Sequence, residues 1–123
     1  NARTREAIAL AVAGRNACDY CASAHSAIAA RLKIDPRSIR QHLAGHAADE
    51  RLQAILALAV AIVDQRGRLT DSELDTARAA GLSDADIVET VGNVVLNIFT
   101  NYLNHAADTD IDFPVVTVGD AAA

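Results

Sequence analysis

Apolar residues recur along most of the chain at intervals of three and four, the spacing typical of helices that bury one face. The clearest set lies towards the C-terminal end and consists of Ile87, Val88, Val91, Val94, Val95, Ile98, Phe99 and Leu103. Ser83 and Asp86 come just before this set and match the capping signal of a helix start. The pattern predicts a long helix that begins after Ser83 and reaches about Ala107.

A second apolar set nearly encircles the helix predicted between Asp49 and Gln65. Its members are Leu52, Ile55, Leu56, Ala59, Val60, Ile62 and Val63. We therefore predict that this is the core helix, central in the domain or sandwiched between subunits. In so small a chain it argues against a lone monomer.

Start and stop signals divide the first part of the chain into two helices. Good helix formers run from Thr4 to Ala13, and Gly14 stands where a left-handed C-terminal cap is expected. Asn16 can then serve as the N-cap of a second helix that runs to about Lys33.

Two shorter helices have start signals of their own, which are Asp35 with Pro36 and the capping box of Thr70 and Glu73. They extend to about residues 44 and 80, where Gly45 and Gly81 follow. The composition is 51% hydrophobic but only 3% aromatic, and much of it is alanine, which suits close helix packing. We predict an all-α fold, a compact helical bundle of about six helices.

The 123 residues match the usual size of one domain and contain no linker or internal repeat, so we expect a single domain over residues 1–123. Beyond the last helix, Asp112, Phe113 and Pro114 begin an extended tail that either packs on a neighbour or frays. The chain begins with Asn1 and contains no Met, which leaves open that an N-terminal segment is missing.

Charge and hydropathy exclude several classes of function. The net charge is −5 and the lysines and arginines are scattered, which argues against nucleic-acid or anionic-lipid partners. The best apolar run, Ala54–Val63, is far shorter than the roughly 20 residues that span a bilayer, so we expect no membrane partner. Two closely spaced cysteines are typical of a redox or metal pair in a reducing compartment, and we expect a cytoplasmic location.

The candidate chemistry lies in the spacing Cys18-x-x-Cys21-x-x-x-His25, which contains the only two cysteines of the chain. On a helix these three side chains share one stripe. A helix N-terminus and a nearby imidazolium lower the thiol pKa from its usual value of about 8.5, whereas the carboxylate of Asp19 opposes that effect. Cys21 and His25 are therefore the candidate activated pair.

Glu6 is a candidate third partner of Cys21 and His25, because the lengths of the two predicted helices bring it level with His25. It lies eight residues before Gly14, or about 12 Å, and His25 lies nine residues after Asn16, or about 13.5 Å. If the two helices are antiparallel, Glu6 and His25 come level. A carboxylate beside an imidazole orients the ring and raises its basicity, which serves proton transfer to or from Cys21.

Together these residues suit the reduction of hydroperoxides. A thiolate that attacks a hydroperoxide becomes a sulfenic acid, and a neighbouring thiol condenses with it to a disulfide, which an outside reductant reopens. Cys18 is placed to resolve the sulfenic acid of Cys21. The redox-active pair needs no bound cofactor.

Other interpretations of this cluster stay open. The cysteines can be buried apolar residues or a structural disulfide. Zinc is a sharper alternative, with Cys18, Cys21 and His25 as three ligands and Glu6 as a fourth. A c-type haem attachment is excluded because Ala22 stands where a histidine would be required.

The spacing Glu6-x11-Cys18-x2-Cys21-x3-His25 resembles the signature of the alkyl hydroperoxidase D-like proteins of the carboxymuconolactone decarboxylase superfamily. Two later segments, residues 101–105 and 112–114, are similar to a C-terminal region common in that superfamily. The resemblance implies an all-helical fold, assembly as homo-trimers or homo-hexamers, and thiol peroxidase activity. It also implies that Cys21 is peroxidatic, that Cys18 resolves and exchanges with the reductant, and that His25 and Glu6 relay protons.

The expected partners are thus a hydroperoxide, an unidentified thiol or dithiol reductant, and further copies of the chain. Tyr20 stands between the cysteines where alkyl hydroperoxidase D itself has a histidine, and Tyr20 and His105 are candidate accessory residues. We expect His42 and His46 at the surface. The alternatives are a carboxymuconolactone decarboxylase-like enzyme, a disulfide reductase or redox sensor, and a zinc-binding structural module.

Overall fold

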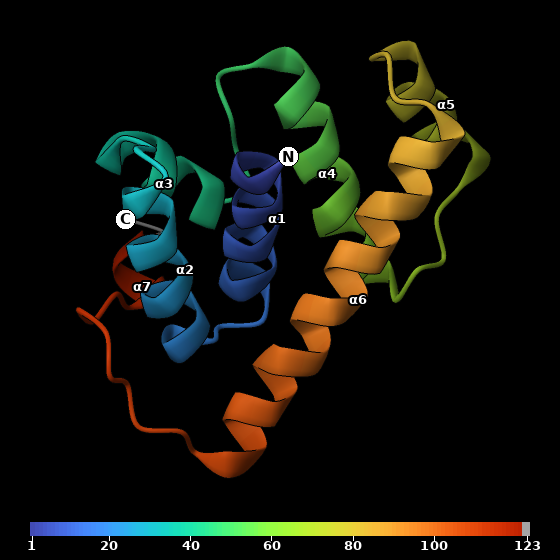
Figure 1. Ribbon diagram of the computed structural model, residues 1–123. Helices are drawn as coiled ribbons and strands as arrows, with labels where there is room; N and C mark the ends of the chain where they lie inside the picture. Colours follow the sequence, from blue (N-terminus) through green and yellow to red (C-terminus); the bar gives the residue numbers. More distant parts are fainter. Residues whose placement is uncertain (122–123) are drawn as a thin grey trace.

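The computed structural model describes residues 1–121, and over that range it contains helices and no strand (Figure 1). The helices are α1 (Ala2–Arg15), α2 (Asp19–Arg31), α3 (Pro36–Leu43), α4 (Glu50–Gln65), α5 (Asp71–Ala79), α6 (Asp84–Ala107) and α7 (Val118–Ala121). The predicted all-α fold is confirmed, and α1 to α6 correspond to the six predicted helices. The four residues of α7 add a short turn of helix to the predicted tail.

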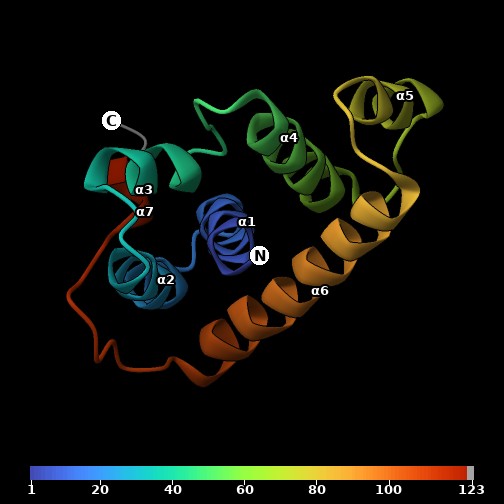
Figure 2. The same cartoon turned by 45° about the horizontal axis from the view of Figure 1, so that its top comes forward.

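The central element is α1, which lies among α2, α3, α4 and α6 (Figures 1 and 2). Its residues from Ala7 to Ala13 are all buried, although the sequence pattern predicted that α4 is central in the domain or sandwiched between subunits. The small side chains of α1 allow neighbours to approach it from every side. By contrast, α4 buries Leu56 and Ala59 in the core but leaves Ala57 exposed.

Gly14 does not end α1 as a left-handed cap, which corrects the prediction from sequence. It lies within the helix, and the residue with positive φ is Ala17, at 51°. A Cβ at Gly14 would overlap the backbone carbonyl oxygen of Leu43 at the end of α3. Gly14 is thus required for the close approach of two helices.

The start signals of α3, α5 and α6 act as predicted. The Asp35 side chain accepts the N–H of Ser38 at 3.0 Å, and Pro36 follows in the first turn of α3. The capping boxes of Thr70 and Glu73 and of Ser83 and Asp86 are both formed, at the starts of α5 and α6. These local signals could be read without tertiary information because each bond spans only three residues.

The long helix α6 has two different apolar faces. One face packs into the core through Ile87 and Val94. The opposite face carries seven large exposed side chains, and no other helix covers it in Figure 2. We call this face the outer stripe; it consists of Val88, Val91, Val95, Leu96, Phe99, Tyr102 and Leu103. No helix within residues 1–121 is long and apolar enough to cross a bilayer.

The segment after α6 packs on its own chain. It turns at Asp108, which has a φ of 47°, and returns across α2 to reach α7 beside α3 (Figure 1). The Val116 N–H donates to Ser23 Oγ at 2.8 Å, and the Val118 N–H donates to Asp19 Oδ1 at 2.8 Å. We call residues 108–118 the strap; it is anchored to the first turns of α2.

Candidate active site

Cys18 and Cys21 form a disulfide at the N-terminus of α2. Their Cα atoms are 5.3 Å apart, and the two residues are only 1% and 3% exposed. Cys18, rather than the predicted Asn16, is the N-cap of α2, and its sulfur accepts the Cys21 N–H at 3.2 Å. The chain reaches this position through Ala17, whose positive φ turns it from the end of α1 into α2. The redox pair is thus built into a helix cap.

The predicted pairing of Glu6 with His25 is present in the structure. Nδ1 of His25 lies 2.8 Å from Oε2 of Glu6, and the two side chains are 21% and 17% exposed. His25 lies one turn beyond Cys21 on α2, and Glu6 reaches it from the neighbouring α1. Within the described residues, no hydrogen bond joins His25 to either sulfur. The carboxylate therefore orients an imidazole that remains available to a proton donor or acceptor beside Cys21.

A cavity of about 340 Å³ opens beside Cys18. Its wall comes from the turn before α2, the end of α6 and the start of the strap, and the lining residues are Ala17, Cys18, Asp19, Tyr20, Asn104, His105, Asp108, Thr109 and Ile111. Cys21 is not among them. Of the two sulfur-bearing residues, Cys18 is thus the one next to this opening.

Both predicted accessory residues lie in the wall of this cavity, but neither has a hydrogen bond to a sulfur in the described structure. The Tyr20 ring packs edge-on against Phe113 of the strap, with ring centres 5.9 Å apart. Burial, together with the nearby Asp112 carboxylate, raises the pKa of the Tyr20 phenol, which therefore stays neutral. His105 places Nε2 3.3 Å from the carbonyl oxygen of Ala17.

Sequence reasoning missed the role of the asparagines of α6. Asn104 Nδ2 lies 3.5 Å from Cys21 Sγ, and Asn16 Nδ2 donates to Asn101 Oδ1 at 2.9 Å. Asn101 is fully buried. The available signal was the recurrence of asparagine at positions 97, 101 and 104, which puts polar groups on the buried face of an apolar helix.

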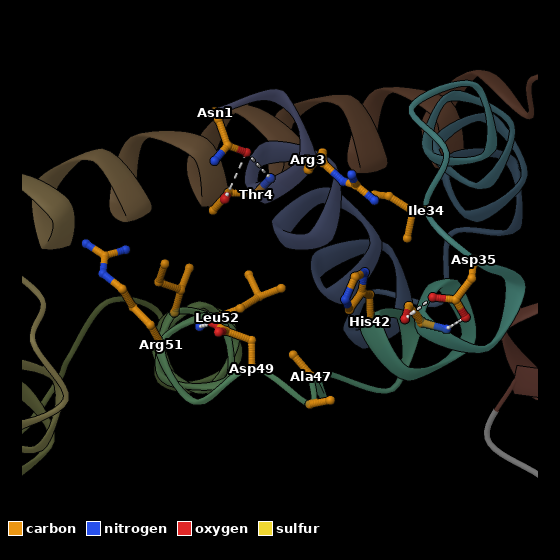
Figure 3. Close-up of a pocket in the computed structure, with 13 residues that line it drawn as sticks. Asn1, Arg3, Thr4, Ile34, Asp35, His42, Ala47, Asp49, Arg51 and Leu52 are labelled. Atoms are coloured by element: carbon orange, nitrogen blue, oxygen red, sulfur yellow. Dashed lines mark hydrogen bonds between the residues drawn. The ribbon is translucent and has the colours of Figure 1, made fainter.

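A second cavity, of about 500 Å³, lies at the other end of α1, between α3 and the start of α4 (Figure 3). His42 lines it and is only 6% exposed, so the expectation of a surface residue was wrong. Its Nδ1 has no hydrogen-bond partner in the described structure, and burial lowers the pKa of the imidazole. Among residues 1–121, no group of three or more His, Cys, Asp and Glu side chains could hold a metal ion.

Comparison with known proteins agrees with this architecture. Residues 1–49 match the carboxymuconolactone decarboxylase family. A peroxidase-related protein from Silicibacter sp. TM1040 has a similar structure, with a TM-score of 0.79 at 23% identity over 94% of this chain and 60% of its own. No curated protein matches the sequence.

A peroxidase-related protein from Ralstonia eutropha JMP134, described as an alkylhydroperoxidase AhpD core, gives a TM-score of 0.78 at 21% identity. That match covers 86% of this chain and 57% of the other. The chain therefore spans about 60% of the length of these solved structures. The match over residues 1–49 agrees with the superfamily that the sequence resembles, and the two solved structures share its helical fold.

Proposed function

We propose that this chain of the alkyl hydroperoxidase D-like and carboxymuconolactone decarboxylase superfamily is a thiol-dependent peroxidase. One observation carries the proposal: the Cys18–Cys21 disulfide lies at the start of α2, and His25, which pairs with Glu6 of α1, lies one turn further along the same helix. The two cysteines can give up or accept two electrons as they pass between dithiol and disulfide, and the oriented imidazole beside them can donate or accept a proton.

In the first step, the Cys21 thiolate attacks the distal oxygen of a hydroperoxide. The new S–O bond forms as the O–O bond breaks, and the leaving alkoxide takes a proton from His25 to become an alcohol. Cys21 is then a sulfenic acid, two electrons more oxidised. Glu6 holds the imidazole ring and stabilises its charged form before the proton leaves.

In the second step, the Cys18 thiolate attacks the sulfur of that sulfenic acid. The S–S bond forms, the S–O bond breaks, and hydroxide leaves as water after it takes a proton. The product is the disulfide found in this structure. An external dithiol then attacks Cys18, supplies two electrons and restores both thiols. The cavity supports this order of exchange, because Cys18 lines it and Cys21 does not.

The test is hydroperoxide consumption by the reduced protein in the presence of a dithiol. We expect Cys21→Ser to abolish both turnover and single-round oxidation. Cys18→Ser should abolish turnover but keep one round of oxidation, detected as a sulfenic acid adduct. Steady turnover that survives Cys21→Ser would refute the proposal.

A second candidate function is disulfide reduction, because the cavity beside Cys18 suits exchange with a disulfide partner as well as with a dithiol. The two functions differ in the oxidant. The reduced protein should react faster with hydroperoxides than with protein disulfides if it is a peroxidase. The reverse order of rates would favour the reductase.

We further propose that the chain associates with copies of itself through the outer stripe of α6. The stripe runs over residues 88–103, or about 22 Å of helix, and residues 90–104 carry no charged side chain. Its seven side chains present roughly 600–800 Å² of apolar surface, near the share of about 800 Å² that one partner contributes to a standard interface. Gly92 lies on the same face with open space around it, which allows another helix to come close.

Sedimentation velocity tests this association. Phe99 is 64% exposed, so Phe99→Glu should leave the monomer folded and shift an oligomer to the monomer. Ala79→Glu on the exposed side of α5 is the control and should keep the oligomer. A monomeric wild type, or an oligomer that Phe99→Glu leaves intact, would contradict the proposal.

A further inference from the structure

Asn104 brings a neutral donor to one of the two redox sulfurs. Its Nδ2 lies 3.5 Å from Cys21 Sγ and 2.9 Å from the carbonyl oxygen of Thr100. A primary amide has two N–H donors, so the group can serve both acceptors at once. Cys21 is only 3% exposed, so water hardly reaches its sulfur. Asn104 supplies the hydrogen-bond donor that water would provide at an exposed thiol.

The end of α6 is fixed against the turn that leads into α2. Asn101 Oδ1 accepts from Asn16 Nδ2 at 2.9 Å, and His105 Nε2 lies 3.3 Å from the carbonyl oxygen of Ala17. These two contacts lie on either side of Asn104 along the helix and join α6 to the residues just before Cys18. Asn104 is thereby held in place by its neighbours rather than free to leave the sulfur.

We infer that Asn104 stabilises the thiolate of Cys21 and is a further catalytic residue of this site. A sulfur in a disulfide is a weak acceptor, whereas a thiolate accepts strongly, so the amide interacts better with the reduced, ionised state. A buried thiol without such a donor ionises less readily than one in water. The catalytic meaning of this contact rests on the proposed peroxidase function.

The amide differs from the other groups near Cys21 because it carries no charge. The charged or titratable groups around the disulfide are the His25–Glu6 pair, and Asp19, Tyr20, His105 and Asp108 in the wall of the cavity beside Cys18. The amide of Asn104 does not ionise. Its removal should therefore raise the pKa of Cys21 without changing the charge of any neighbouring group.

The experiment measures the Cys21 titration directly in a Cys18→Ser background, which leaves one thiol. The pH dependence of the iodoacetamide alkylation rate gives the pKa of Cys21 without any peroxide. Asn104→Ala should raise that pKa by about one unit and slow alkylation several-fold at pH 7. Asn104→Asp keeps the shape of the side chain but adds a negative charge, and should raise the pKa at least as far.

Asn93→Ala is the matched control. Asn93 lies on the same helix and donates from Nδ2 to the carbonyl oxygen of Glu89 at 2.8 Å, the same backbone contact that Asn104 makes with Thr100. Asn93→Ala should leave the Cys21 pKa unchanged. Circular dichroism establishes that each variant is folded, and Asn104→Asp replaces Asn104→Ala if the latter unfolds.

An unchanged Cys21 pKa in a folded Asn104 variant would overturn the inference, even if the wild type reduces hydroperoxides. A raised pKa in a protein that lacks peroxidase turnover would support the thiolate contact and refute only the proposed function. The alkylation and turnover measurements therefore separate the two.

Discussion

His25 on α2 and Glu6 on α1 meet across 19 residues of sequence, with Nδ1 of the imidazole 2.8 Å from Oε2 of the carboxylate. Both side chains are less than a quarter exposed, so bulk water screens the pair only partly. The contact ties the second turn of α1 to the helix that holds the cysteines. It gives the imidazole a fixed orientation relative to Cys21.

We expect Glu6→Gln to slow oxidation of Cys21 by a hydroperoxide about tenfold or more, because the imidazole loses the charge that stabilises its protonated form. Stopped-flow oxidation of the reduced protein measures this rate. Glu89→Gln removes an exposed carboxylate from α6 and should have no effect. Equal rates for wild type and Glu6→Gln would show that Glu6 has only a structural role.

The sequence was sufficient for features that depend on local spacing. The capping box of Thr70 and Glu73 and the Asp35 cap each join residues three apart, and both were found in place. The pairing of Glu6 with His25 was also predictable, since it needed only helix rise and an antiparallel turn. Helix composition and period then sufficed for the all-α fold.

The sequence was insufficient where the outcome depended on which helices meet. Gly14 is a common residue at helix ends, and only the nearby carbonyl of Leu43 shows that it serves packing instead. Asn104 reaches Cys21 over 83 residues, a contact that no local pattern contains. The apolar residues of α6 have a helical period on both faces, so the pattern alone could not tell the core face from the outer stripe.

Gly14→Ala should lower the free energy of unfolding by about 2 kcal/mol, because the added Cβ overlaps the Leu43 carbonyl and must push α1 and α3 apart. Urea unfolding measures this loss. Gly92→Ala is the control, since its Cβ meets nothing within 4 Å, and in dilute solution it should stabilise α6 by about 0.5–1 kcal/mol. If Gly14→Ala leaves the free energy of unfolding unchanged, α1 and α3 separate easily.

His42 should make stability depend on pH. Burial lowers the pKa of the folded imidazole, and Asp35 only partly opposes this shift. The unfolded chain therefore binds the proton first as the pH falls below about 6.5, and the free energy of unfolding decreases from there down to the lowered folded pKa. Above about pH 6.5 the contribution is fully present.

Urea unfolding at pH 7.5 and 5.5 checks this dependence. His42→Leu should lose less stability on acidification than the wild type, because no imidazole has to stay neutral in the folded state. His46→Gln replaces an exposed histidine and should retain the wild-type pH dependence. If His42→Leu follows the wild-type curve, another group causes the acid sensitivity.

The strap should loosen when its anchor on α2 is removed. Ser23 is fully buried, and its Oγ accepts the Val116 N–H at 2.8 Å, so Ser23→Ala leaves that amide without its partner at a cost of about 1–2 kcal/mol. We expect faster hydrogen exchange at Val116 and faster alkylation of the reduced cysteines. Ser26→Ala is the control, because Ser26 Oγ has no hydrogen-bond partner within the described residues. Equal exchange in both variants would mean that the strap is held by the packing of Phe113 on Tyr20 instead.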